Sequence, residues 1–276
     1  MKNKIYTIIL LFIVTLAASA QEYLEVPSLV SEATYATVTT DVDGQQARSY
    51  TYRYDPELRI SLWVAYPLNT SLIGKGSRGE GWHPAPELPN NIQPILYKGF
   101  AYGSGYDRGH QIPSADRLRP DANEQTFTFV NATPQLHDFN GGIWAELEKL
   151  VRTWAKRSDT LYVVTGAVPG NTTIEDNQGN PVNIPSAYYK AVLRRNKDKK
   201  GNIHWSAACV YLPHKTVPIE TWQFNLRLFR AKSISISELE KKTGEKYFPL
   251  LDSIIGAEQA EQIRQTPPRD NPWWWK

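Results

Sequence analysis

The sequence contains one cysteine, Cys209, among 276 residues. A single thiol can form neither an intrachain disulfide nor a cysteine-based metal site, so no cross-link of either kind holds this fold together. The chain must therefore rely on a buried apolar core, and a chain of this length can bury a substantial one. The stretch HWSAACVYL around Cys209 alternates like a strand, so we expect this thiol to be buried and structural.

The first 20 residues have the pattern of a secretory signal peptide. Lys2 and Lys4 precede an apolar run, and the small residues at 18–20 precede Gln21. The run is short for a membrane span and polar sequence follows it, so we expect cleavage and no membrane anchor. This pattern predicts a secreted or periplasmic protein.

After this signal, about 256 residues remain, enough for one large domain or two small ones. We expect a lead segment over 21–47, a single domain over 48–255 and a tail over 256–276. The tail ends in TPPRDNPWWWK. Such a segment cannot fold alone, so it either packs on the domain or binds a partner.

The net charge excludes a strong overall attraction to polyanions. The chain has 31 basic and 28 acidic residues, and loss of Lys2 and Lys4 with the signal leaves 29 basic residues and a net charge of +1. Any affinity for nucleic acid must therefore come from local placement of charge.

Runs rich in β-branched and aromatic residues predict strands. Two such runs flank Asp55-Pro56, a Gly-, Pro- and Asn-rich stretch predicts a long loop, and the charged turn NKDKKGN predicts the tip of a hairpin. The expected elements are a strand–turn–strand over 48–67, a loop over 74–98, strands over 126–131 and 161–168, and a hairpin of 187–195 with 203–212.

Two helices are predicted. Over 141–157, apolar residues recur at three- and four-residue spacing. Over 235–244, Ser235 is followed three residues later by Glu238, and Gly244 ends the pattern, as in a capped helix. Strands with few helices indicate an α+β or mixed α/β fold around one central sheet.

The stretch YDRGHQIPSADR at 106–117 surrounds His110 with two aspartates and two arginines. Gly109 precedes the histidine and a proline follows it three residues later, which argues against a regular helix or strand. One interpretation is a surface histidine in a loop. The other is a general base beside groups that bind phosphate.

A longer pattern favours the second interpretation. DRGH at 107–110, followed by FTFVNATPQLHDFNGGIWAELEKLVR at 127–152, resembles the signature of the DNA/RNA non-specific endonucleases, the ββα-metal nucleases with a DRGH motif. The spacing from Asn140 to Glu148 and Arg152 on the expected helix also matches.

The resemblance extends over residues 48–253. It implies an α+β fold with a ββα-metal (His-Me finger) nuclease core on a mixed, mainly antiparallel central sheet. It also implies hydrolysis of phosphodiester bonds in DNA and RNA, with Mg²⁺ as cofactor and Mn²⁺ as a substitute.

The resemblance implies that His110 is the general base, that Asn140 is the protein ligand of the cation, and that Glu148 holds water of the cation's hydration shell. Mg²⁺ commonly takes few protein ligands, so one amide oxygen suffices. Helical side chains lean toward the N-terminus, so Glu148 should point back toward Asn140. An unperturbed imidazole titrates at about pH 6.5, so activity should show an acidic limb at about pH 6–7 if the pKa of His110 is roughly unperturbed.

Three arginines complete the implied site. Arg152 contacts phosphate, Arg78 in the loop GSRGEGW helps to hold the scissile phosphate, and Arg108 either reaches phosphate or braces its loop. Taken without the resemblance, Glu148 and Arg152 are four residues apart and could form an ordinary surface ion pair. Asn140 alone could be an ordinary helix N-cap.

Neighbouring residues have simpler expected roles. Asp107 should accept hydrogen bonds that organise the turn, and Gly109 should permit a close approach or an unusual φ. Asn131 should tie together the loop before the helix, and His137 should be an exposed loop histidine.

Two alternatives remain open at this point. Nine tryptophans and fifteen tyrosines could serve a module that binds carbohydrate or a surface. The chain could also be a degenerate nuclease that acts as a binding protein, although His110, Asn140 and Glu148 are intact. No base-reading motif is visible, and contacts to phosphate alone predict a broad range of nucleic acids. The oligomeric state is open.

Overall fold

The computed structural model describes residues 23–30, 33–97 and 105–276, and the expected signal peptide lies outside these ranges. Among the residues described, no helix combines the length and the apolar composition needed to cross a membrane.

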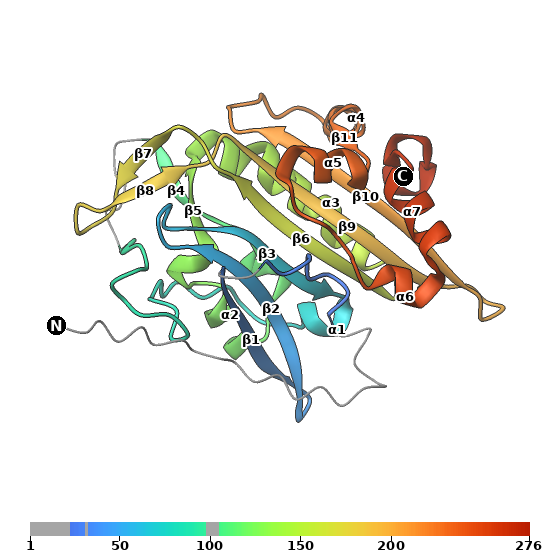
Figure 1. The fold of residues 1–276 in the computed structure, drawn as a ribbon, viewed down its shortest axis with the longest axis horizontal. Coiled ribbons are helices and arrows are strands. Elements are labelled where there is room, and N and C mark those ends of the chain that lie inside the picture. Colours follow the sequence, from blue (N-terminus) through green and yellow to red (C-terminus); the bar gives the residue numbers. More distant parts are fainter. Residues whose placement is uncertain (1–22, 31–32, 98–104) are drawn as a thin grey trace.

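A seven-stranded antiparallel sheet forms the centre of the structure (Figure 1). Every neighbouring pair in it is antiparallel, so it is more uniform than the mixed sheet that the resemblance implied. Its strands in spatial order are β1 (Thr34–Val42), β2 (Gln45–Asp55), β3 (Ile60–Leu68), β6 (Thr160–Val168), β9 (Ala187–Lys197), β10 (Ile203–Pro213) and β11 (Ser233–Ile234).

Both faces of this sheet are buried, which explains its long apolar strands. On β3, Val64 and Tyr66 belong to the core on one face, whereas Trp63 and Ala65 belong to the core on the other. Helix α3 (Ala145–Ala155) packs in the first core. The second core holds Cys209, buried as expected, and is closed by α5 (Ile236–Thr243), α6 (Leu251–Ile255) and α7 (Ala257–Gln265). The expected α+β class is confirmed. Helices cover both faces of the central sheet and so form three layers with it.

The strand–turn–strand over 48–67, the central strand at 161–168 and the hairpin of β9 with β10 are confirmed. The segment 21–47, expected only as a lead, supplies β1, which pairs with β2 from Thr34–Tyr54 to Val42–Gln45. Two hairpins lie outside the sheet: β4 (Tyr106–His110) with β5 (Ala132–Leu136), and β7 (Thr172–Glu175) with β8 (Pro181–Ile184).

The strand predicted at 126–131 is wrong. Phe129–Asn131 forms a 3₁₀ turn, and the backbone around it bonds to His83, with His83 N 3.0 Å from Phe127 O and Phe129 N 2.9 Å from His83 O. The alternation reflects the burial of Phe127 and Phe129, and the β pairing is limited to one isolated bridge between His83 and Thr128. Conversely, Tyr106–His110 forms a strand where irregular backbone was expected.

The helix predicted over 141–157 is interrupted at its beginning. Phe139–Trp144 forms a π-helical turn with non-helical backbone at Gly142 (φ −100°, ψ −119°), and α3 begins only at Ala145. Asn140 therefore lies in the π turn and does not cap α3, whose N-cap residue is Trp144. Such π turns occur often at functional sites.

The second predicted helix is confirmed in detail. Ser235 accepts a hydrogen bond from the backbone of Glu238, whose side chain bonds back to Ser235, and Gly244 ends α5 with φ +74°. The other helices are α1 (Thr70–Ile73), α2 (Pro120–Gln125) and α4 (Trp222–Ala231), and further 3₁₀ turns cover Ser114–Asp116, Pro268–Asp270 and Pro272–Trp275.

The C-terminal tail packs on the domain. Trp274 is fully buried, its ring lies edge-on to that of Trp154 in α3 at 4.8 Å, and Trp154 Nε1 donates to the Trp274 carbonyl at 2.8 Å. The Arg194 guanidinium lies 3.8 Å from the centre of the Trp273 ring. The tail thus supports the helix that carries Glu148 and Arg152.

Replacing Trp274 with alanine should lower the free energy of unfolding by about 3–5 kcal/mol, because the change leaves a cavity against Trp154. Urea denaturation measures this loss. The matched control is Trp222→Ala, at a side chain 37% exposed, which should change stability by less than about 0.5 kcal/mol. Equal losses in the two variants would contradict a stabilising role for the tail.

Candidate active site

The hairpin of β4 and β5 carries His110 at its end. His110 pairs with Ala132, and Gly109 pairs with Thr133. A Cβ atom at Gly109 would lie 2.1 Å from the side chain of Gln135, so any larger residue there would force the Gln135 side chain to move. Close approach, rather than an unusual φ, is thus the reason for this glycine.

Asn131 ties the connections around this hairpin together, as expected. Its Oδ1 accepts from Ile112 N at 2.9 Å, and its Nδ2 donates to the carbonyls of Ile112 at 3.0 Å and Thr126 at 2.8 Å.

The His110 ring is packed between aromatic side chains. The centroids of Trp82 and Phe127 lie 4.6 Å and 5.0 Å from its own, and the residue is 8% exposed. Burial, with the positive charges of Arg78 and Arg108, lowers the pKa of His110 to about 3. The imidazole is therefore neutral over the physiological range, so the condition of an unperturbed pKa, under which an acidic limb at about pH 6–7 was predicted, is not met. Its Nε2 is buried and has no hydrogen-bond partner among the described residues.

Asn140 is held against the same hairpin. Its Nδ2 donates to Asp107 Oδ2 at 2.9 Å, so the Asp107 carboxylate joins β4 to the π turn. Asp107 also faces Nδ1 of His137 at 3.1 Å and raises the pKa of that exposed histidine. Asp107 is thus an organising acceptor, as expected, and His137 is exposed.

These residues fit a weakly ligated divalent cation. Because its amide nitrogen is held by Asp107, Asn140 offers a cation its Oδ1 oxygen. Within the described ranges, no three His, Cys, Asp or Glu residues are grouped to hold a metal. This donor set suits Mg²⁺, which keeps several waters, better than a cation that requires a dense cage of ligands.

Arg152 does not pair with Glu148, although their four-residue spacing on the helix suggested an ion pair. Arg152 instead contacts Asp116 at 2.9 Å, and Asp116 accepts a hydrogen bond from the Tyr66 hydroxyl at 3.0 Å. Glu148 is partly buried, and this burial raises the pKa of its carboxyl, while the charges of Lys190 and Arg152 act in the opposite direction.

Arg108 braces its surroundings. Its Nη1 donates to the Leu96 carbonyl at 2.9 Å, and its guanidinium lies 5.2 Å from the centre of the Trp82 ring. Arg78 is exposed, lies 5.1 Å from the centre of the Phe127 ring, and acts electrostatically on both His110 and Glu148. Arg78 and His110 both lie against the Phe127 ring, so the structure brings these two residues together.

Sequence reasoning missed two residues of this neighbourhood. Trp82 gave no signal that it would cover the imidazole. The sequence does contain a signal for Lys190, because a lysine within the otherwise apolar run AYYKAV of a central strand is unusual. Its side chain is buried, with Nζ 4.9 Å from the centre of the Trp144 ring.

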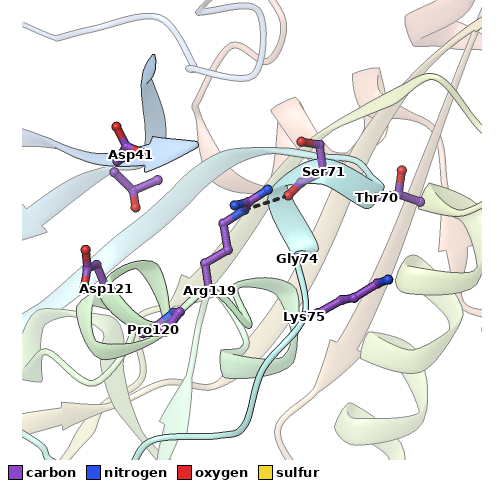
Figure 2. Close-up of a pocket in the computed structure, with 9 residues that line it drawn as sticks. Asp41, Thr70, Ser71, Gly74, Lys75, Arg119, Pro120 and Asp121 are labelled. Atoms are coloured by element: carbon purple, nitrogen blue, oxygen red, sulfur yellow. Dashed lines mark hydrogen bonds between the residues drawn. The ribbon is translucent and has the colours of Figure 1, made fainter. Parts of the chain in front are cut away.

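A separate open pocket of about 530 Å³ lies beside α1 and α2 (Figure 2). Lys75 and Arg119 line it together with Asp41 and Asp121, so its charges offset one another. Arg119 is already bonded to the Ser71 carbonyl at 3.2 Å and to Asp43. None of the expected site residues lines this pocket.

Comparisons with known proteins identify the family. The sequence model of the DNA/RNA non-specific endonuclease family matches residues 30–253. A nuclease of Nostoc sp. (strain PCC 7120) is 30% identical over 222 residues, which cover 78% of this chain and 76% of that protein. The mitochondrial nuclease EXOG of Xenopus laevis is 28% identical over 234 residues, which cover 80% of this chain and 63% of that protein.

Among solved structures, a chain in the crystal structure of the EndoG/EndoGI complex has the same fold. It superimposes with a TM-score of 0.62 at 20% identity, over 86% of this chain and 94% of that one. Because the family match spans most of the sequence, this chain belongs to the DNA/RNA non-specific endonucleases, a family of hydrolases.

Proposed function

We propose that this protein is an exported endonuclease that hydrolyses phosphodiester bonds of both DNA and RNA with Mg²⁺, for which Mn²⁺ can substitute. The observation that carries the proposal is the hydrogen bond from Asn140 to Asp107, because it brings an amide oxygen to the hairpin that carries His110. Export to the periplasm or the medium is supported by the signal-like sequence of residues 1–20.

His110 acts as the general base toward the attacking water. Its lowered pKa keeps the ring neutral, and its buried Nε2 has no partner among the described residues, so that nitrogen can accept a proton from a water that reaches it. A base of low pKa is intrinsically weak. Positioning of the water and neutralisation of phosphate charge must therefore supply much of the rate enhancement.

Asn140 Oδ1 would hold the cation, and Glu148 would contact water of its hydration shell rather than the ion itself. When bound, Mg²⁺ supplies positive charge that stabilises the phosphate in the transition state and assists the departing oxygen. The role of Glu148 is supported by its position on the helix that follows the π turn of Asn140.

Arginines hold the phosphate. Arg78 is exposed beside His110, and Arg152 uses one nitrogen for Asp116 and keeps further N–H donors for a phosphate oxygen. Arg108 serves chiefly as a brace through Leu96, with its remaining donors available to the substrate. Contacts to phosphate rather than to base edges give a broad substrate range.

The first test is digestion of plasmid DNA and total RNA. The protein should degrade both with Mg²⁺ and neither with a chelator, and His110→Ala should reduce the rate by about 10²–10⁴-fold because it removes the base. His204→Ala, at an exposed histidine, is the matched control and should leave the rate unchanged. A folded His110→Ala variant with full activity would exclude this mechanism.

A second test ranks the two polar residues beside the cation. Asn140→Ala should raise the Mg²⁺ concentration needed for half-maximal rate, because it removes the protein ligand. Glu148→Ala should reduce turnover less than Asn140→Ala does, since another water can replace a contact made through water. If Glu148→Ala proves the more damaging of the two, Glu148 contacts the ion directly and its assignment here is wrong.

A third test follows the histidine rings by NMR in metal-free protein. Burial disfavours the charged imidazole of His110, so its resonances should not titrate between about pH 5 and 8. His137 is the internal control, because its contact with Asp107 raises its pKa and it should titrate above about pH 6.5. Titration of His110 alongside or above His137 would show that its ring is not desolvated.

A further inference from the structure

Asp116 is a buried carboxylate to which the proposed mechanism gives no role. The residue is 1% exposed and lies in the 3₁₀ turn Ser114–Asp116, shortly after His110 in the sequence. Its two carboxylate oxygens have different partners: Oδ1 accepts from Arg152 Nη1 at 2.9 Å, and Oδ2 accepts from the Tyr66 hydroxyl at 3.0 Å. Burial of a carboxylate is costly unless the group is paired and hydrogen-bonded, and these two contacts offset that cost.

Further contacts fix the position of Asp116. Its backbone N–H donates to the Pro113 carbonyl at 2.9 Å, and its own carbonyl accepts from Arg117 Nη1 at 2.8 Å. The Tyr66 hydroxyl comes from β3 of the central sheet. Burial, together with the charge of Asp116, raises the pKa of Tyr66, so this hydroxyl stays protonated and remains a donor. The carboxylate is therefore held both through its own backbone and by the sheet.

Arg152 is less enclosed than its partner. Its side chain is 18% exposed, whereas that of Asp116 is 1% exposed. Among the described residues, the Arg152 side chain donates one hydrogen bond, from Nη1 to Asp116. A guanidinium group carries several N–H donors, so most of them are left for a ligand. Burial alone would lower the pKa of Arg152, but the charge and the hydrogen bond of Asp116 raise it, so the guanidinium stays charged.

The ion pair also joins helix α3 to the segment that carries the base. Asp107 and Asp116 lie on either side of His110 in the sequence. Asp107 accepts from Asn140 in the π turn, and Asp116 accepts from Arg152 farther along α3. The His110 segment is thus bonded at two points to the stretch from Asn140 to Arg152. One point is the proposed ligand of the cation, and the other is a proposed phosphate contact.

We propose that Asp116 is a positioning residue for the endonuclease reaction: anchored by the Tyr66 hydroxyl, it holds the guanidinium of Arg152 in the orientation that serves the phosphate. This inference rests on the proposed function, because it assumes that Arg152 contacts the phosphate. Asp116 itself touches no substrate, because it is buried and both of its carboxylate oxygens have protein partners. A donor that is already oriented needs no reorganisation when charge develops in the transition state.

A double-mutant cycle of Asp116→Asn and Arg152→Ala tests this proposal by initial rates on plasmid DNA with Mg²⁺. Asp116→Asn conserves side-chain size and removes the charge, whereas Arg152→Ala removes the guanidinium that Asp116 holds. Asp252→Asn is the matched control. Asp252 also pairs with an arginine, Arg264 at 2.8 Å, but this pair lies in helices α6 and α7, which close the second core.

Asp116→Asn should lower kcat by about 10-fold or more with little change in KM, because the guanidinium loses its orientation toward charge that develops in the transition state. In the Arg152→Ala background, the same change should cost less than about 2-fold, since no guanidinium remains to be held. Asp252→Asn should leave kcat unchanged in both backgrounds. An equal loss from Asp116→Asn in both backgrounds, or no loss in either, would overturn the proposal.

Free guanidinium ion supplies a readout that a purely structural role would not move. Arg152→Ala leaves a space beside the Asp116 carboxylate, and the ion can enter it because the Arg152 side chain is partly exposed. Guanidinium chloride, far below denaturing concentrations, should raise kcat of Arg152→Ala by about 10-fold relative to sodium chloride of equal ionic strength. In the double variant this rescue should be less than about 2-fold. Rescue of equal size in both proteins, or in neither, would overturn the proposal.

Tyr66→Phe provides a second variant in case Asp116→Asn does not fold. It removes only the hydroxyl that donates to Asp116 Oδ2, so kcat should fall modestly, and this fall should disappear in the Arg152→Ala background. Persistence of the fall there, or its absence in the otherwise unchanged protein, would overturn the proposal.

Failure of the proposed function can be told apart from failure of this inference. A wild-type chain that cleaves neither DNA nor RNA would overturn the proposed function and with it this role. A wild-type chain that cleaves both, with additive losses from Asp116→Asn and Arg152→Ala, would overturn the role of Asp116 alone.

Discussion

The hydrogen bond between Asn140 and Asp107 determines how the site is assembled. It joins two segments that no backbone pairing connects, the β4 strand that ends at His110 and the π turn that precedes α3. The π turn at Phe139–Trp144 and the non-helical Gly142 leave Asn140 outside the regular helix. A regular helix beginning at residue 141 would have used Asn140 as a cap and directed its amide toward the backbone.

The elements that could be predicted from sequence are those fixed by local chemistry. The Ser235–Glu238 capping box and Gly244 define both ends of α5 within one short stretch. The hairpin of β9 with β10 was equally visible, because its turn and its two apolar strands are adjacent in the sequence. The family pattern placed Glu148 correctly on a helix, but His110 lies in a strand and Asn140 in a π turn, which differ from the irregular backbone and the regular helix expected for them.

What could not be predicted depends on residues that are distant in sequence. Phe127 and Phe129 alternate as strand residues do, yet their backbone bonds to His83 and forms no strand. The ionisation of His110 depends on Trp82 and Phe127, which come from two other segments. Arg152 pairs with Asp116 across the fold rather than with the glutamate one turn away. In each case the competing contact is tertiary, and a pattern in one window contains no information about it.

Helix α3, the π turn and the hairpin of β4 and β5 all lie in one continuous excursion, a stretch of chain that leaves the central sheet and returns to it. The chain leaves β3 at Leu68 and returns in β6 at Leu161, which is the pairing partner of Leu68 (Figure 1). Arg78, His110, Asn140, Glu148 and Arg152 all lie between these two points. Because its ends are neighbours, this excursion is suited to transfer as one block by recombination between related genes, and the sheet beneath would keep its order.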